Sequence, residues 1–129
     1  MAKGNKKSCW FSFAKESIAR YFAEERREPL LFVSKARLRK KFKTYYVAIH
    51  TKGITIFECR MAFGDKVEIV EEKEWFLFNR VVIDYYFMKS IFLFEGDEGM
   101  EWELTMKRKG KELQQAIEHH SSLEVVVTS

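Results

Sequence analysis

The residues best suited to chemistry lie in one short basic run. Between Lys35 and Lys43, six of nine residues are cationic: Lys35, Arg37, Arg39, Lys40, Lys41 and Lys43. Guanidinium groups bind phosphate or carboxylate through paired hydrogen bonds, whereas lysines attract anions as point charges. The composition of the run therefore predicts a surface that binds an anion.

An extended conformation gives the basic run a second interpretation. It would place four cations on one face of a strand, where like charges repel each other. These four are Lys35, Arg37, Arg39 and Lys41. An anion would relieve the repulsion, but lysines also protect the edge of a sheet from pairing with other chains. We favour binding of an anion or acidic partner by a narrow margin over a solvated edge strand.

The charge of the whole chain is divided unevenly. Residues 1–43 carry thirteen Lys/Arg and four Glu, a net charge of +9, whereas residues 44–129 carry ten Lys/Arg and fifteen Asp/Glu, a net charge of −5. The basic run lies in the positive part. A strongly polarised chain of this kind indicates an anionic partner.

No catalytic or metal-binding pattern accompanies the basic run. The sequence contains no glycine-rich phosphate loop and no HExxH or GxSxG motif. His119 and His120 are adjacent, so on a helix they would point apart and could not hold one ion. For Asp84, which lies in an apolar segment, we favour pairing with Lys or Arg across a sheet over a place in a pocket. We expect a non-catalytic protein with no metal, no cofactor and no small-molecule substrate.

The two cysteines, Cys9 and Cys59, lack the spacing of a redox motif or zinc site. In the absence of a recognisable secretion signal we expect free thiols in the cytoplasm. Apolar windows are too short for a spanning helix, so association with a membrane would be peripheral.

Hydrophobic periodicity predicts the elements that position the basic run. Apolar residues recur at helical spacing from residue 12 to about 27, and Pro29 ends this helix. A second amphipathic helix is predicted at Lys111–His120. Alternating or apolar segments between them predict strands at 30–33 (continuing into the basic run), 45–50, 54–59, 67–70, 81–88, 91–94 and 100–106.

Two further segments have two interpretations each. The acidic residues Glu71, Glu72 and Glu74 are either a solvated loop, which we favour, or a patch complementary to the basic run that would join chains head to tail. Val125, Val126 and Val127 predict either a short edge strand or a disordered end.

This order of elements resembles the pleckstrin-homology (PH) superfold, in particular its bacterial PH-like branch. The resemblance covers about residues 30–120, and its most specific stretch is Lys35–Glu58, a basic first hairpin with a Gly-containing turn. It implies an α+β, mostly β fold: about seven antiparallel strands in a partly open barrel, with a capping C-terminal helix and an extra N-terminal amphipathic helix. Lys35, Arg37 and Arg39 resemble the basic pattern with which some PH domains bind inositol phosphates.

The expected organisation is a flexible basic tail (1–11), an N-terminal helix (12–28), a PH-like domain (30–120) and a tail (121–129). The resemblance implies a binding module whose basic run contacts an anionic membrane surface or an acidic protein, in the cytoplasm or peripherally at a membrane. One alternative is a nucleic-acid-binding protein that stacks bases on Phe42, Tyr45 and Tyr46. Another is a self-assembling, homo-oligomeric or partner-inhibiting protein.

Overall fold

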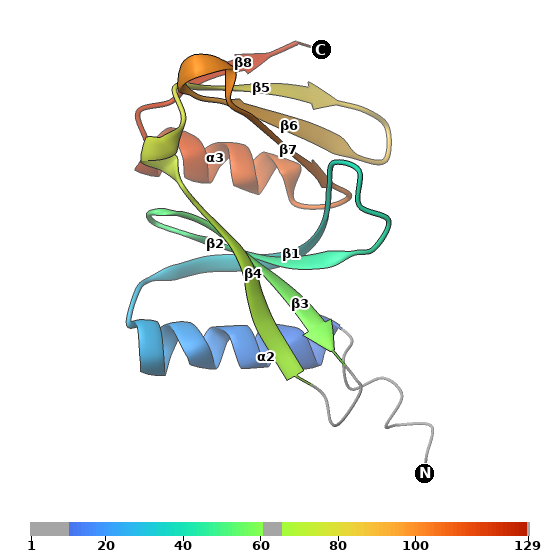
Figure 1. The fold of residues 1–129 in the computed structure, drawn as a ribbon, viewed down its shortest axis with the longest axis vertical. Helices are drawn as coiled ribbons and strands as arrows, with labels where there is room; N and C mark the ends of the chain where they lie inside the picture. The colour runs from blue at the N-terminus through green and yellow to red at the C-terminus, as the bar shows by residue number, and fades with distance from the viewer. Residues whose placement is uncertain (1–10, 61–65, 129) are drawn as a thin grey trace.

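The computed structural model describes residues 11–60 and 66–128 (Figure 1). The chain is mostly β, with one helix before the strands and one after the seventh. The elements in order are α2 (Phe11–Arg20), the π-helical turn η1 (Tyr21–Arg26), β1 (Leu30–Leu38), β2 (Tyr45–His50), β3 (Gly53–Arg60), β4 (Lys66–Glu74), the 3-10 turn η2 (Trp75–Leu77), β5 (Arg80–Tyr85), β6 (Ser90–Glu95), the 3-10 turn η3 (Asp97–Gly99), β7 (Glu101–Met106), α3 (Gly110–His120) and β8 (Glu124–Val127).

The strands form one sheet in the order β4-β3-β2-β1-β7-β6-β5-β8. All neighbours are antiparallel except β5 and β8, which run parallel. β1 joins the two halves of the sheet because it pairs with β2 along most of its length and with β7 near its end, where Ala36 lies opposite Met106. β4 and β8 are the edge strands. The sheet is open because β4 does not pair with β5 or β8.

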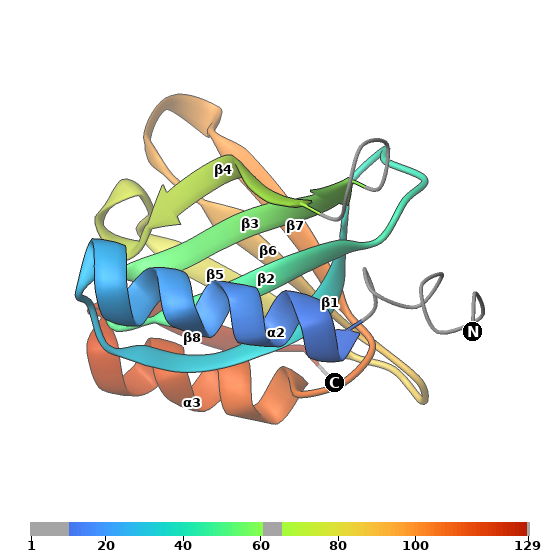
Figure 2. The same cartoon turned by 90° about the horizontal axis from the view of Figure 1, so that it is seen from below.

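The main core fills the space between the two halves of the sheet. In Figure 1, β5, β6 and β7 form an upper layer and β1 to β4 a lower one, while α3 covers the space between them on one side (Figures 1 and 2). Leu113, Ala116 and Ile117 of α3 join this core, at the helical spacing expected from the sequence. Aromatic side chains from β6, β7 and η2 fill much of the remainder.

A second cluster holds α2 against the outer face of β1, β2 and β3. Ala14, Ile18 and Phe22 are buried there with Val33 and Phe57. The N-terminal helix therefore packs on the sheet, which excludes its apolar stripe from contact with a separate partner. As expected, the helical segment ends before Pro29, but its last turn, η1, is π-helical.

Several strand boundaries differ from the sequence-based expectation. The structure has eight strands, one more than about seven, because Glu124–Val127 forms β8 at the edge beside β5. β4 continues to Glu74, so the acidic residues expected in a loop belong to a strand paired with β3. β5 ends at Tyr85, and residues 86–89 form a turn closed by the Tyr86 amide, which donates to the Lys89 carbonyl at 2.8 Å.

The turn predicted at Lys52-Gly53 is confirmed. Gly53 begins β3 with φ 157°, and a Cβ there would collide with the backbone of Lys73 and Glu74. Only glycine lets the chain of β4 pass this close to β3. The turn thereby fixes where the two strands meet.

Cys59 is disulfide-bonded, and none of the described residues is a free cysteine. The expectation of a free thiol is therefore wrong for Cys59. This cysteine no longer supports a location in a reducing compartment. Cys9 lies outside the described residues. Neither of the helices that the structure describes combines the length and apolar composition needed to cross a membrane.

Candidate functional site

The basic run does not form one extended strand. β1 ends at Leu38, Arg39 and Lys40 form a turn, and the Lys41 amide donates to the Leu38 carbonyl at 3.1 Å. The prediction of four cations on one strand face is therefore wrong. The turn forms because Lys40 adopts a left-handed conformation with φ 63°, which bends the chain away from β1.

The structure distributes the six predicted cations among three places. Lys35 and Arg37 lie on the outer face of β1, with the Lys35 Nζ 6.0 Å from the Phe11 ring centre at the start of α2. Arg39 reaches β7, where its guanidinium lies 3.6 Å from a carboxylate oxygen of Glu101 and equally far from one of Glu103. The other three, Lys40, Lys41 and Lys43, lie with Arg39 in the β1–β2 loop but do not reach β7 in any ion pair described.

Two other loops contribute cations that the sequence analysis missed. The β5–β6 turn ends in Lys89, and the β7–α3 loop consists of Lys107, Arg108 and Lys109. These two loops are neighbours because Ser90 pairs with Met106 in the sheet. The three consecutive cations at residues 107–109 are visible in the sequence. Only the fold shows that they lie at the same end of the molecule as the β1–β2 loop.

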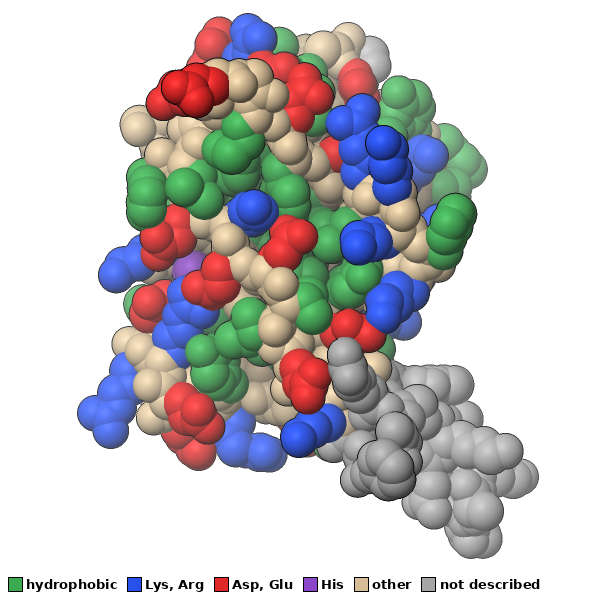
Figure 3. Space-filling model, in the orientation of Figure 1, with side chains coloured by type: hydrophobic (Ala, Val, Ile, Leu, Met, Phe, Trp, Pro, Cys, Tyr) green, Lys and Arg blue, Asp and Glu red, His purple; other side chains and the backbone are tan. Residues whose placement is uncertain are grey.

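We call the three loops together the basic end: residues 39–44, 86–89 and 107–109. They carry eight Lys/Arg and no Asp/Glu, and every residue in them is exposed. Both ribbon views place the three loops at the same end, on the right (Figures 1 and 2). The space-filling view shows Lys and Arg side chains gathered along this side beside hydrophobic ones (Figure 3).

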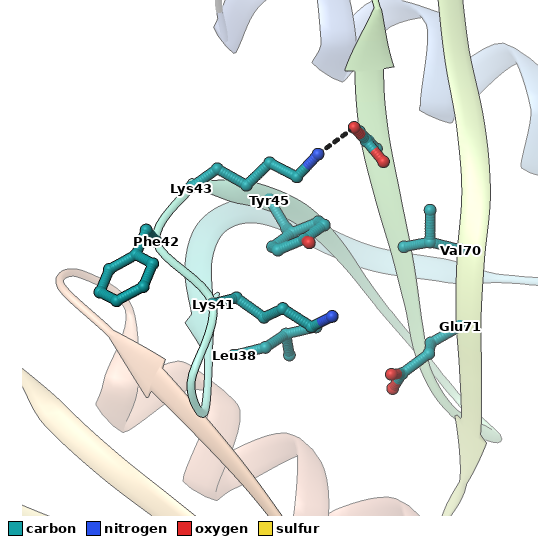
Figure 4. Close-up of a pocket in the computed structure, with 8 residues that line it drawn as sticks. Leu38, Lys41, Phe42, Lys43, Tyr45, Val70 and Glu71 are labelled. Atoms are coloured by element: carbon teal, nitrogen blue, oxygen red, sulfur yellow. Dashed lines mark hydrogen bonds and ion pairs between the residues drawn. The ribbon is translucent and has the colours of Figure 1, made fainter.

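A hollow of about 390 Å³ opens beside the β1–β2 loop (Figure 4). Its lining residues are Leu38, Lys41, Phe42, Lys43, Tyr45, Glu58, Val70 and Glu71. The Lys43 ammonium forms an ion pair with Glu58, and Lys41 extends across the hollow toward the side where Glu71 lies (Figure 4). Two lysines and two glutamates balance each other, so the hollow does not favour an anion. Lys35, Arg37 and Arg39 do not line it.

The aromatic residues of the first hairpin differ in accessibility. Phe42 is 94% exposed and points away from the hollow (Figure 4), whereas Tyr45 and Tyr46 are buried. The nucleic-acid alternative requires bases to stack on Tyr45 and Tyr46, but neither ring presents an accessible face. Phe42 alone is available for such a contact.

Two of the three residues in the acidic cluster on β4, Glu71 and Glu72, are used within the chain. Glu72 forms an ion pair with Arg26 and accepts a hydrogen bond from Thr55 Oγ1 at 2.6 Å. Glu71 accepts a hydrogen bond from Trp102 Nε1 at 2.8 Å. These partners lie on η1, β3 and β7, so the acidic cluster ties distant elements together, which argues against both a solvated loop and a free patch for a second chain.

A buried polar network fastens the end of the N-terminal helix. The side chain of His50 is 1% exposed, and its Nε2 atom lies 3.1 Å from Thr55 Oγ1. The same hydroxyl oxygen accepts a hydrogen bond from Arg26. Burial, followed by the nearby Arg26 charge, lowers the pKa of His50 to about 4. Burial alone would raise the pKa of Glu72, but hydrogen bonds from Arg26 and Thr55 lower it. His50 is thus a neutral structural residue at pH 7.

Asp84 does not form the expected ion pair. Its side chain is half-buried on β5, and the described residues offer it no cationic partner within ion-pair distance. The rings of His119 and His120 lie 6.1 Å apart at an angle of 59°. In residues 11–60 and 66–128, no three His, Cys, Asp or Glu side chains gather in a way that could hold a metal ion.

Lys40 and Lys109 occupy left-handed backbone conformations, both with φ 63°, in loops of the basic end. Glycine adopts this conformation without steric cost, whereas other residues lose about 1–2 kcal/mol. We predict that Lys40→Gly stabilises the protein by about 0.5–1 kcal/mol, after allowance for the greater freedom of glycine in the unfolded chain. Urea unfolding measures this change. Lys40→Gln is the control, since it removes the charge but keeps the strain, and equal stability of the two variants would contradict the prediction.

The chain matches no protein-family model and no curated protein. Function is therefore inferred from the geometry of the basic end.

Proposed function

We propose that this protein is a non-catalytic, PH-like binding module whose basic end contacts an anionic partner, either a membrane surface or an acidic protein. The order of elements supports the PH-like part of the proposal. Seven consecutive strands form antiparallel pairs, β1 pairs with both β2 and β7, and a helix follows β7 and covers the core. In this reading the two halves of the sheet are the walls of a partly open barrel, and α2 and β8 are additions.

The observation that carries the binding proposal is the charge of the basic end: eight cations and no carboxylate of their own in three adjacent exposed loops, with only Arg39 and Lys43 of the eight paired with glutamates of neighbouring strands among the ion pairs described. Like charges gathered in one place repel each other, so their concentration destabilises the free protein and is relieved by an anion. The lysines in left-handed conformations support the same reading. A fold selected for stability alone would favour glycine at positions 40 and 109.

The cations spread over an open surface and do not converge on the hollow beside the β1–β2 loop. An open array of point charges suits an extended anionic surface better than a single small anion, which needs convergent donors. This array differs from the inositol-phosphate pattern suggested by Lys35, Arg37 and Arg39, because Lys35 and Arg37 lie outside it on β1 and Arg39 is paired with Glu101 and Glu103.

The direct test removes three charges from the basic end. In Lys40→Gln/Lys41→Gln/Arg108→Gln we expect affinity for phosphatidylserine-containing vesicles, or for poly-glutamate, to fall about 100-fold, since each cation near an anionic surface contributes about 1 kcal/mol. Co-sedimentation measures vesicle binding, and fluorescence anisotropy measures poly-glutamate binding. The expected loss is smaller at high salt, where screening has already weakened the wild type.

The matched control removes three exposed cations far from the basic end: Arg20→Gln/Arg27→Gln/Lys52→Gln. Both variants have the same net charge, so only the location of the cations differs. Lys52 lies in the β2–β3 turn, at the opposite end of the molecule (Figures 1 and 2). Arg27 lies shortly before β1, whose Leu30 is paired with His50 beside that turn, and Arg20 is the last residue of α2. Equal loss in the two variants would show nonspecific attraction. Absence of wild-type binding to both probes would reject the proposed function.

A further inference from the structure

Apolar side chains project from two loops of the basic end. Phe87, at the β5–β6 turn, is 96% exposed, and its neighbours Tyr86 and Met88 are exposed as well. Phe42, in the β1–β2 loop, is almost fully exposed in the same way. The loops are far apart in the sequence, but they lie at the same end of the molecule (Figures 1 and 2). Electrostatic attraction does not account for aromatic rings held in water.

From this arrangement we infer that the basic end docks on an anionic lipid bilayer and inserts Phe42, Phe87 and Met88 at the boundary between headgroups and acyl chains. The inference rests on the proposed function and names its partner. Peripheral proteins bind bilayers by combining apolar insertion with electrostatic attraction to anionic lipids. The surrounding loops supply the charge, and the two apolar tips supply the insertion.

The composition of the basic end favours lipid over protein. Six of its eight cations are lysines. Lysine is depleted in protein–protein interfaces, where arginine is enriched, whereas clusters of either residue attract anionic headgroups. The only hollow described at this end is lined by balanced charges and has Phe42 pointing out of it, so it offers no anchoring pocket for an acidic peptide.

The arrangement of the β5–β6 turn also suits a bilayer interface. Lys89 Nζ lies 5.7 Å from the centre of the Tyr86 ring, so an ammonium and an aromatic ring with a hydroxyl lie at the base of the turn. Tyrosine and lysine are typical of the headgroup level. Phe87 and Met88 extend beyond them without a polar atom that would need a hydrogen-bond partner in the lipid.

Substitution of the tips tests the insertion. We expect Phe42→Ser/Phe87→Ser to lower affinity for phosphatidylcholine vesicles containing phosphatidylserine about tenfold or more, with the relative loss preserved at high salt. The matched control is Phe76→Ser, because Phe76 is 79% exposed in η2 at the opposite end. Binding of the Phe76 variant should equal that of the wild type. Urea unfolding of all variants checks that each is folded.

A reporter placed at the tip tests the location directly. In Phe87→Trp we expect vesicles to shift the added emission to shorter wavelength and brominated lipids to quench it, whereas the added emission of Phe76→Trp should not change. The described native tryptophans, Trp75 and Trp102, are largely buried and supply a subtractable background. A shift at position 87 without one at position 76 supports insertion.

The outcomes separate this inference from the proposed function. If wild type binds anionic vesicles but the double serine variant binds equally and Phe87→Trp shows no shift, insertion is rejected and electrostatic binding stands. If wild type binds poly-glutamate and not vesicles, the partner is an acidic protein, which overturns the lipid assignment alone. Binding to neither probe overturns both.

Discussion

Phe94→Ala is expected to destabilise the protein by about 3–5 kcal/mol, the range for loss of a fully buried aromatic ring. Phe94 is 0% exposed on β6. Its ring centre lies 5.0 Å from that of Phe78 and 5.6 Å from that of Trp102. The ring centres of Trp75 and Phe92 each lie 6.4 Å away. Removal of the ring leaves a cavity that four large, rigid neighbours cannot fill.

The location of Phe94 explains why the effect should be large. β4 and β5 are joined by the chain but not by hydrogen bonds, so this side of the sheet depends on side-chain packing. Trp75 and Phe78, between β4 and β5, pack on Phe94 there, and the Trp102–Glu71 hydrogen bond crosses the same gap. Loss of Phe94 weakens the contact between the two halves of the sheet.

Thermal and urea unfolding measure this prediction. The expected loss corresponds to a fall of roughly 10–20 °C in the melting temperature for a domain of this size. Phe94→Leu keeps most of the volume and should lose far less, about 1.5 kcal/mol. The exposed control Phe76→Ala should be nearly neutral. A Phe94→Ala variant as stable as Phe94→Leu would show that the two halves do not depend on this cluster.

Acidification is the second change with a large expected effect, and it acts through His50. The folded protein lowers the pKa of His50 from 6.5 to about 4, so the unfolded chain binds this proton more readily. Stability is therefore full above about pH 6.5 and falls as the pH drops toward 4. For this group alone the loss between pH 7 and pH 5 is about 2 kcal/mol.

The groups that face His50 set the direction of the effect. Arg26 and Lys52 disfavour its protonation, whereas Glu28 and Glu72 favour it less strongly than burial opposes it. Glu28 Oε1 lies 3.4 Å from His50 Nδ1 and is a buried atom without a hydrogen-bond partner among the described residues. The lowered pKa of Glu72 adds a further loss of stability below its ordinary value of 4.5.

Urea unfolding at a series of pH values separates His50 from the carboxylates. We expect the wild type to lose stability between pH 7 and pH 5, and His50→Gln, which can still donate to Thr55, to show a much flatter profile in this range. His119→Gln/His120→Gln is the control for exposed histidines and should retain the slope of the wild type. Parallel profiles for wild type and His50→Gln would contradict the assignment.

The sequence predicted the elements with regular periodicity and failed where remote partners decide. Tyr45–His50 has the predicted bounds, and the alternation before Met106 and the helical stripe of α3 were correctly recognised. β4 extends through its acidic residues because Arg26, Thr55 and Trp102 satisfy two of the carboxylates. None of these partners is near β4 in the sequence.

The basic run is recognisable in the sequence as a concentration of charge, but the pattern predicts the continuation of a strand, whereas the structure ends β1 at Leu38 and places the rest of the run in a loop. Its cations separate because Lys40 turns the chain, a conformation that residue preferences assign to glycine or asparagine. The β5–β6 turn was expected at residues 89–90, too late in the chain, because Tyr-Phe-Met-Lys contains no Gly, Pro, Asn or Asp, the usual turn signals. The exposed aromatic tip that results from this turn could not be distinguished from strand core in the sequence.

The parallel pairing of β8 with β5 has a practical consequence for handling the protein. Val127 lies opposite Ile83, near the end of β5 that leads into the basic end, and α2 also begins on that side (Figure 2). A tether joined at the end of β8 would therefore crowd the lysine-rich loops, whereas one attached through the exposed side chain at position 52 would leave them accessible and keep the backbone bonds of Thr51 and Lys52 to Trp75. Surface immobilisation should use the β2–β3 turn. Attachment near the basic end would block it and lower the measured binding even in the wild type.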